Sequence, residues 1–290
     1  MSKLALGTVQ FGLDYGISNK TGRVNDDHIK KILLLAKKEN IDVIDTAISY
    51  GTSEKAIGDA GITDFKFITK LPDIPKNCSN IDKWIEENVK SSITKLGINY
   101  FEGILIHNTN NLLSEKRNEL IKSLKKIKTI GLVKKIGISI YDPKEYERLI
   151  KIMRFDIVQA PLNIIDRRLV TSGLLSKLCS EGVEIHVRSI FLQGLLLMKR
   201  DSIPSYFGSW FNIWDRWELE LTKNDLNPIE LCLSYPRSLP EIDKIIVGVE
   251  NTMQLNEIIQ KSKIKINDFD TSFMISNDLK LINPYNWRKL

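Results

Sequence analysis

Cysteine and histidine are scarce in this chain of 290 residues, which holds three of each. The cysteines, Cys78, Cys179 and Cys232, are odd in number, far apart and without C-x-x-C spacing. This argues against both a disulfide framework and a cysteine-ligated zinc site, and it favours a reducing compartment. The three histidines are also widely separated, so we predict that the protein has no metal centre.

Long hydrophobic runs are lacking as well. No segment approaches the roughly 20 apolar residues that cross a bilayer, and the opening MSKLALGTVQFG has no apolar segment of signal-peptide type. The 42 basic and 36 acidic residues give a net charge of +6, and the basic clusters are short and not interleaved with aromatic residues. We therefore expect a soluble cytoplasmic protein whose partners are neither nucleic acid nor membrane.

The glycine signature of a doubly wound nucleotide-binding fold, GxGxxG, does not follow the first expected strand, where the sequence reads GTVQFG. The chain instead alternates short apolar runs with helical patterns. Such alternation is typical of parallel strands joined by helical crossovers, and eight repeats favour a closed barrel. We predict a single-domain (β/α)8 TIM barrel over residues 1–290, with strands at residues 3–9, 41–45, 65–70, 101–107, 133–139, 155–161, 183–190 and 243–249.

Capping residues mark where several helices should begin. Asn25, Ser53 and Asn80 each stand before or at the start of a helical pattern and are candidate N-caps. Three helical patterns end at a glycine, Gly97, Gly131 or Gly182, where a left-handed residue can close the last turn. The expected helices cover residues 28–40, 53–60, 81–97, 112–131, 142–153, 169–182 and 228–235.

Ionisable residues end three consecutive strands. The run IDVID ends at Asp45, FKFITK ends at Lys70, and FEGILIH ends at His107, while Tyr50 follows Asp45 in the next loop. Because parallel strands bring ends of one polarity to one face, we expect these four side chains to converge. They are the candidate catalytic residues.

Together these four groups fit proton transfer to a carbonyl oxygen. A tyrosine is a weak acid at neutral pH, and a nearby lysine cation should lower its pKa, with an aspartate holding the ammonium in place. A neutral histidine can donate a hydrogen bond that orients the substrate. The set includes neither an obvious nucleophile nor a metal, so a reduction would need a hydride donor from outside the chain.

Each residue also has an ordinary structural interpretation. Asp45 and Lys70 would form a buried ion pair, Tyr50 would be a packing or surface tyrosine, and His107 a histidine at a strand end. Such an interpretation is reasonable for each residue alone, but it explains poorly why all four occur together. Two other functions stay open, because a fold does not determine an activity. One is a regulatory protein that binds the cofactor as a sensor, and the other is a barrel sugar isomerase or lyase.

The order and placement of Asp45, Tyr50, Lys70 and His107 resemble the catalytic tetrad of the aldo-keto reductases. The resemblance extends over nearly the whole chain through the motifs LGTVQFG, IDTAISYG, ITKL, GISIYD, VQAPLNIIDR, RSIFLQGLLL and IIVGVENTMQLNEI. It implies the (β/α)8 barrel, a bound NADPH or NADH and a small carbonyl substrate. The residues that it implies as cofactor contacts are Gly7, Thr8, Ser139, Gln159, Arg188, Gly248, Glu250, Asn251, Gln254 and Glu257, with Ser139 and Gln159 at the nicotinamide amide.

Several positions depart from the pattern that the family often shows. Ile140 stands where the family often has asparagine, and Arg188 stands where an aromatic ring often stacks on the nicotinamide. Gln254 occupies the expected place of an arginine that binds the 2′-phosphate of NADPH, and Glu250 adds a carboxylate nearby. The family favours NADPH, whereas a carboxylate suits the free 2′-hydroxyl of NADH, so both cofactors stay open.

For the substrate, the resemblance suggests that Asn163 lines the site. Tyr206 and Trp210 follow the seventh strand and are a candidate wall or lid, although most of the aromatic residues near them have the spacing of a helix that packs on the barrel. Arg167, Arg168 and Arg188 are candidates for binding a phosphate or carboxylate, and the first two are equally well explained as solvated loop charges. The opening LGTVQFGLDYGI resembles bacterial members associated with sugar or nucleotide-sugar metabolism. We predict an NAD(P)H-dependent reductase with Tyr50 as general acid.

Overall fold

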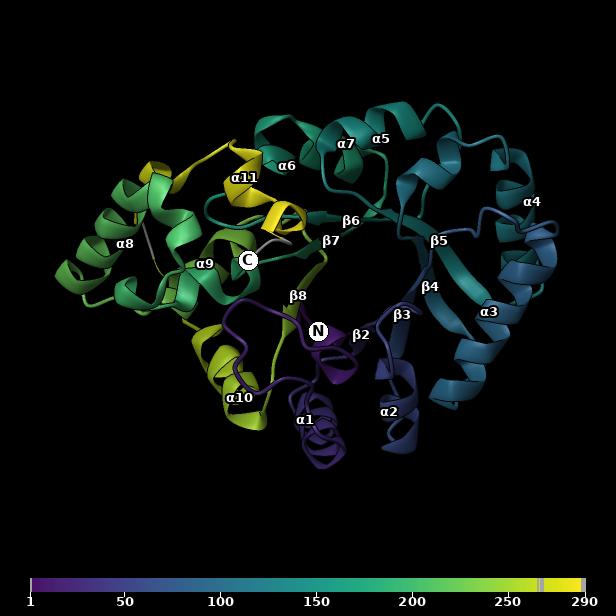
Figure 1. Cartoon of the computed structure of the whole chain (residues 1–290), viewed down its shortest axis with the longest axis horizontal. Helices are drawn as coiled ribbons and strands as arrows, with labels where there is room; N and C mark the ends of the chain where they lie inside the picture. Colours follow the sequence, from purple (N-terminus) through teal and green to yellow (C-terminus); the bar gives the residue numbers. More distant parts are fainter. Residues whose placement is uncertain (1, 265, 267–268, 288–290) are drawn as a thin grey trace.

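A computed structural model describes residues 2–264, 266 and 269–287 of the chain. In these residues, eight parallel strands pair in chain order, and β8 pairs with β1 to close the ring. This is the predicted (β/α)8 TIM barrel, formed as a single domain (Figure 1). The strands are β1 (Leu4–Gly7), β2 (Val43–Asp45), β3 (Lys66–Leu71), β4 (Phe101–Ile106), β5 (Val133–Ser139), β6 (Ile157–Pro161), β7 (Glu184–Arg188) and β8 (Lys244–Gly248).

The helices lie outside the ring of strands (Figure 1). They are α1 (Asp26–Lys38), α2 (Ser53–Asp59), α3 (Ile81–Leu96), α4 (Arg117–Thr129), α5 (Pro143–Leu149), α6 (Arg168–Thr171), α7 (Leu174–Ser180), α8 (Phe211–Lys223), α9 (Pro228–Arg237), α10 (Thr252–Lys261) and α11 (Leu279–Ile282). Short 3-10 turns cover Val9–Phe11, Thr109–Leu113, Leu192–Leu197, Arg200–Ser202, Ser205–Trp210, Ser272–Met274 and Pro284–Trp287. None of the helices in the described ranges is long and apolar enough to cross a membrane.

The capping predictions for α1 and α3 are confirmed. The side chains of Asn25 and Asn80 accept hydrogen bonds from the backbone N–H groups three residues later, and Gly97 closes α3 in the left-handed region at φ 67°. The prediction for Ser53 is wrong, because it is the first residue of α2 and makes no capping bond. Its hydroxyl instead donates to the backbone oxygen of Thr8, which ties α2 to the loop after β1.

Two predicted helices are broken in the structure. The pattern at 112–131 becomes a 3-10 turn followed by α4, and the pattern at 169–182 becomes α6 and α7. Gly173 separates the latter two, with φ at 77°, a conformation that only glycine adopts at little cost. The segment predicted at 142–153 forms a shorter helix, α5, whose capping box joins Asp142 and Glu145.

Two layers of apolar packing hold the barrel. The larger lies between strands and helices, and it includes Phe207, Trp214 and Trp217, so these aromatic residues pack the core as a helical stripe. The smaller cluster takes one residue from each of six strands and fills the interior of the ring: Ala5, Val43, Ile68, Leu105, Ile157 and Ile246. A filled interior leaves the carboxyl ends of the strands as the place for a site.

Candidate active site

A cavity of about 500 Å³ lies at the carboxyl ends of the strands. The four candidate catalytic residues, Asp45, Tyr50, Lys70 and His107, all line it. They come from the end of β2, the loop after it, β3 and the residue that follows β4. The structure therefore brings together the four side chains that the sequence predicted to converge.

A buried ion pair lies at the base of this group. The Lys70 Nζ donates to the Asp45 carboxylate at 2.6 Å and to the backbone oxygen of Thr46 at 2.9 Å, and both charged side chains are at most 5% exposed. The same Nζ lies 3.5 Å from the Tyr50 hydroxyl. Since burial lowers the pKa of Lys70 and Asp45 opposes that shift, the carboxylate is what keeps the ammonium charged.

Tyr50 is held in place from two sides. Its ring lies against the Lys70 ammonium, with 5.0 Å between Nζ and the ring centroid. The backbone of Tyr50 is also held, because Gly12 approaches so closely that an added Cβ would meet the backbone carbonyl oxygen of Tyr50 at 1.8 Å. Only glycine permits this contact between the loop after β1 and the loop that carries Tyr50.

The expected lowering of the Tyr50 pKa is not what the structure shows. Burial, and then the charge of Asp45, raise the pKa of Tyr50, while the guanidinium of Arg188 lowers it. The hydroxyl is therefore protonated at neutral pH, as a proton donor must be. If Tyr50 gave up its proton, the Lys70 ammonium would face a phenolate and stabilise it.

His107 is neutral at physiological pH. Burial and the nearby cations of Lys70 and Arg188 lower the pKa of His107 to about 4. Its Nδ1 lies 3.4 Å from the Ser49 hydroxyl, and its ring meets that of Tyr50 edge-on, with centroids 6.1 Å apart. A neutral imidazole at this place can donate a hydrogen bond to a substrate oxygen next to the Tyr50 hydroxyl.

Two buried side chains expected at the nicotinamide amide, Ser139 and Gln159, lie side by side on β5 and β6. The Ser139 hydroxyl donates to the Gln159 side-chain oxygen at 3.4 Å, and the Gln159 amide donates to Asp45 at 2.7 Å. Gln159 therefore links this edge of the cavity to the ion pair. Both residues line the cavity.

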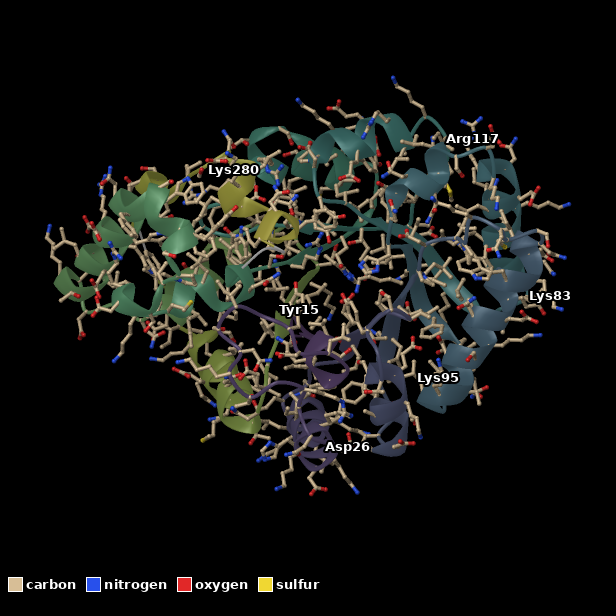
Figure 2. The ribbon with its side chains drawn as sticks, viewed as in Figure 1. Tyr15, Asp26, Lys83, Lys95, Arg117 and Lys280 are labelled. Atoms are coloured by element: carbon tan, nitrogen blue, oxygen red, sulfur yellow. The ribbon has the colours of Figure 1, made fainter. Side chains whose placement is uncertain are left out.

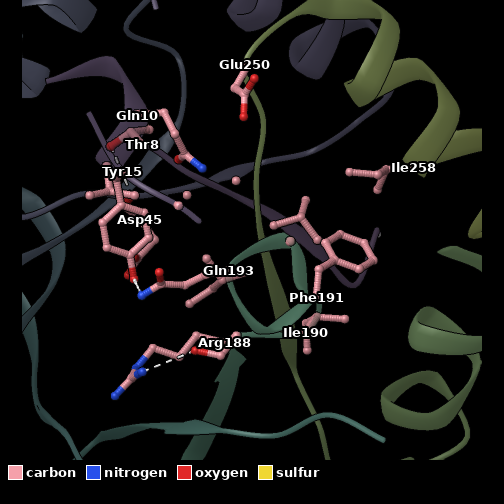
Figure 3. A pocket seen from close by; sticks show the side chains of 18 of the residues that line it. Thr8, Gln10, Tyr15, Asp45, Arg188, Ile190, Phe191, Gln193, Glu250 and Ile258 are labelled. Carbon is pink, nitrogen blue, oxygen red and sulfur yellow. Dashed lines mark hydrogen bonds between the residues drawn. The ribbon is translucent and has the colours of Figure 1, made fainter. Parts of the chain in front are cut away.

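A groove on the other side of the cavity has features that fit the phosphate and adenosine part of a dinucleotide. Gly7, Thr8, Gly248, Glu250, Gln254 and Glu257 line it, beside the start of α10. The side-chain oxygen of Gln10 is buried here without a hydrogen-bond partner among the described residues. Figure 3 shows Gln10 with its amide end toward the loop after β8 that carries Glu250. An unpartnered polar atom in a groove indicates a missing donor, and a bound cofactor would supply one.

Four predicted site residues do not line the cavity. Asn163 is fully buried and fixes a turn, where its side chain accepts from Ile165 and Asp166. Asn251 caps α10 through the backbone of Gln254. Tyr206 and Trp210 belong to an aromatic cluster with Phe207, and the Tyr206 hydroxyl donates to the Lys280 oxygen. Within the described ranges, no group of three or more histidine, cysteine or acidic side chains is arranged to hold a metal ion.

Several polar residues that line the cavity were not predicted from the sequence, among them Gln10, Tyr15, Tyr141 and Gln193. These four lie in the loops after β1, β5 and β7, and Gln193 donates to the Tyr15 hydroxyl at 3.1 Å across the mouth. Figure 2 shows Tyr15 near the centre of the molecule, whereas Asp26, Lys83 and Arg117 lie at its periphery. The place of the four residues in the sequence could have indicated them, because the loops that follow the strands of a barrel form the site at this face.

Two curated proteins are similar to this chain in sequence. The chain is 25% identical to the uncharacterized oxidoreductase YqkF of Bacillus subtilis, covering 91% of this chain and 88% of the relative. It is 24% identical to the NADH-specific methylglyoxal reductase of Escherichia coli, with 94% of each chain covered.

Solved structures show the same fold. The holo form of the aldo-keto reductase AKR11C1 from Bacillus halodurans matches with a TM-score of 0.73, at 20% identity over 94% of this chain and 91% of that one. The glycerol dehydrogenase AKR11B4 from Gluconobacter oxydans matches with a TM-score of 0.72, at 20% identity over 98% and 93%. A model of the aldo/keto reductase family matches residues 3–274, and the chain belongs to that family.

Proposed function

We propose that this protein reduces an aldehyde or ketone to the alcohol with a nicotinamide cofactor. The observation that carries the proposal is the Tyr50 hydroxyl, protonated and 3.5 Å from the Lys70 ammonium, in a cavity that a neutral His107 also lines. A proton donor, a cation to stabilise its conjugate base and a neutral hydrogen-bond donor are what a carbonyl oxygen requires as it gains negative charge.

The bound cofactor would supply the hydride that the chain itself lacks. Tyr50 then gives its proton to the carbonyl oxygen, and the phenolate that remains is stabilised by Lys70. Asp45 holds the ammonium in position and keeps it charged. His107 orients the carbonyl oxygen, and Ser139 with Gln159 would hold the carboxamide of the cofactor.

Steady-state oxidation of NADH and NADPH by the purified protein tests the proposal. We expect cofactor oxidation that depends on an added carbonyl compound, for example methylglyoxal, on which the relative from Escherichia coli is named as acting. Deuterium from cofactor labelled at nicotinamide C4 should appear in the alcohol. Cofactor binding without turnover of any carbonyl compound would support the sensor, and a product formed without cofactor oxidation would support the isomerase or lyase.

NADH is the cofactor that the groove favours. The carboxylate of Glu250 lines it and accepts a weak hydrogen bond from Thr21 at 3.4 Å. The side-chain oxygen of Gln254 accepts from the backbone of Glu250, so this side chain is turned back to its own helix end. Among the described residues, the only lysine and arginine that line the cavity are Lys70 and Arg188, which lie with Tyr50 and His107. A 2′-phosphate beside Glu250 would therefore meet an anion without a counter-charge from them.

Exchanging these two side chains should change the cofactor preference. In the variant Glu250→Ala/Gln254→Arg, the ratio of kcat/KM for NADH over NADPH should fall by about 10- to 100-fold, because a repulsion is removed and a guanidinium is added. The control is Glu218→Ala, which removes an exposed carboxylate from α8, outside the cavity. An unchanged ratio in the double variant would contradict the assignment of Glu250 to the ribose.

The expected sugar or nucleotide-sugar substrate receives no particular support from this cavity. Tyr206 and Trp210, the rings expected to stack on a sugar, are not among its lining residues. The side chains near Tyr50 are polar or charged, and one of them, Arg188, indicates a different property of the substrate.

A further inference from the structure

Arg188 ends β7 and lines the cavity, half-buried. Its guanidinium donates to the Ile140 oxygen at 3.0 Å and to the Ser189 hydroxyl at 3.4 Å. Its plane lies over the Tyr141 ring, with 4.4 Å between Cζ and the ring centroid. These contacts hold the guanidinium in one place and use two of its five N–H groups, which leaves the others for a ligand.

In the part of the chain that the structure describes, Arg188 has no anionic partner. No carboxylate there lies within 4.0 Å of its guanidinium, although the arginine is half-buried. The other two arginines that the sequence singled out are used elsewhere: Arg168 pairs with Asp142 and Asp166, and Arg167 donates to Thr271. Neither of them lines the cavity. An uncompensated cation in a partly buried place is costly unless a ligand neutralises it.

The charge of Arg188 acts on the reacting end of the cavity. Burial raises the pKa of Tyr15 and Tyr50 and lowers that of His107, and the guanidinium charge of Arg188 acts to lower the pKa of each of the three. Figure 3 shows Arg188 on the side of Tyr15 and Gln193, away from Phe191 and Ile258 and from the loop that carries Glu250. Here Lys70 is neutralised by Asp45, and the histidine is uncharged. Arg188 therefore leaves this end with one net positive charge.

We propose that the physiological substrate is an anionic carbonyl compound, whose carboxylate or phosphate group binds to Arg188 while its carbonyl oxygen faces Tyr50. This inference rests on the proposed reductase function and names the class of its substrate. Guanidinium groups bind both anions through paired N–H donors. The hydroxyl of Tyr15 can contribute, because it accepts from Gln193 and keeps its own proton to donate.

A purely structural role for Arg188 makes a different prediction. If the guanidinium only positions the Ile140–Tyr141 segment, its removal would lower the turnover of charged and neutral substrates by the same factor. If it binds an anion, the loss would fall mainly on charged substrates. The ratio of two kcat/KM values therefore separates the two roles, whatever happens to the absolute rate.

Two matched pairs of aldehydes provide that ratio. Succinic semialdehyde and butanal differ by a carboxylate in place of a methyl group, and D-glyceraldehyde 3-phosphate and D-glyceraldehyde differ by a phosphate. For the parent protein we expect kcat/KM to be about 10- to 100-fold higher for the charged member of one pair at low ionic strength. The pair with the larger ratio identifies which anion the site accepts.

Arg188→Met should bring that ratio to near one, and Arg188→Lys should retain part of it, because it keeps the charge without the planar fork. Arg216→Met is the matched control, since Arg216 also stacks on a ring, Phe273 at 4.3 Å, but lies outside the cavity. Thermal unfolding confirms that each variant is folded. If the parent and Arg188→Met had equal ratios of kcat/KM for charged over neutral substrates, the anionic substrate class would be wrong, and the reductase function would not be affected. Failure of the parent to reduce any of the four aldehydes would contradict the reductase function itself.

Discussion

Tyr50→Phe should lower kcat for carbonyl reduction by about 10²- to 10⁴-fold, the usual contribution of a general acid. The substitution removes the hydroxyl that lies 3.5 Å from the Lys70 ammonium and leaves the ring in its contact with that cation. The residues that line the cofactor groove are untouched, so the Kd for NADH should change by less than about twofold. Single-turnover measurements with saturating NADH would place the loss in the chemical step.

A second tyrosine–lysine pair supplies the control. The Tyr100 hydroxyl accepts from the Lys134 ammonium at 3.1 Å on the exposed surface, outside the cavity. Tyr100→Phe removes the same atom from a similar neighbour and should leave kcat at the parental value. If Tyr50→Phe reduced its substrate as fast as Tyr100→Phe does, Tyr50 would not be the proton donor, and the tetrad would be only a structural arrangement.

The pH dependence of the parent protein follows from the same groups. His107 has a pKa of about 4, and the raised pKa of Tyr50 keeps its hydroxyl protonated well above neutrality. Between about pH 6 and 8 neither group changes its charge, so kcat should be nearly flat there. A loss of activity is expected only as the pH falls toward 4 and His107 gains a proton.

The barrel and its catalytic face were predictable because they depend on local signals. Apolar runs identify strands, and residues such as Asn80 and Gly97 mark the two ends of a helix by their own hydrogen bonding and backbone conformation. Asp45, Lys70 and His107 occupy strand ends or the residue next to one, where parallel topology determines the face on which they lie. Their convergence therefore needed no knowledge of loops.

Loop residues were predicted less well, since loop conformation depends on contacts between distant segments. The wall expected from Tyr206 and Trp210 packs instead into an aromatic cluster. The mouth is formed by Tyr15 and Gln193, 178 positions apart, which meet only because the loops after β1 and β7 cross the same face. The direction of the Tyr50 pKa shift was missed for a related reason, because burial depends on the whole surrounding structure.

Removing one partner of the Asp45–Lys70 pair should destabilise the fold more than any exposed charge substitution. Lys70→Met leaves the Asp45 carboxylate buried, with the Gln159 amide as its remaining side-chain partner. An uncompensated buried charge of this kind costs about 3–5 kcal/mol, so the free energy of unfolding in urea should fall by that amount. Lys55→Met, which breaks the exposed pair with Asp59, should cost less than about 1 kcal/mol.

The double variant Asp45→Asn/Lys70→Met separates the structural role of the pair from its catalytic role. Both charges are then absent, so most of the lost stability should return, and the two substitutions should show a favourable coupling energy. Activity should not return, because no ammonium remains to stabilise the phenolate of Tyr50. Recovery of both stability and turnover would mean that the pair serves only the fold. Stability regained without turnover is the result that assigns Lys70 to the reaction.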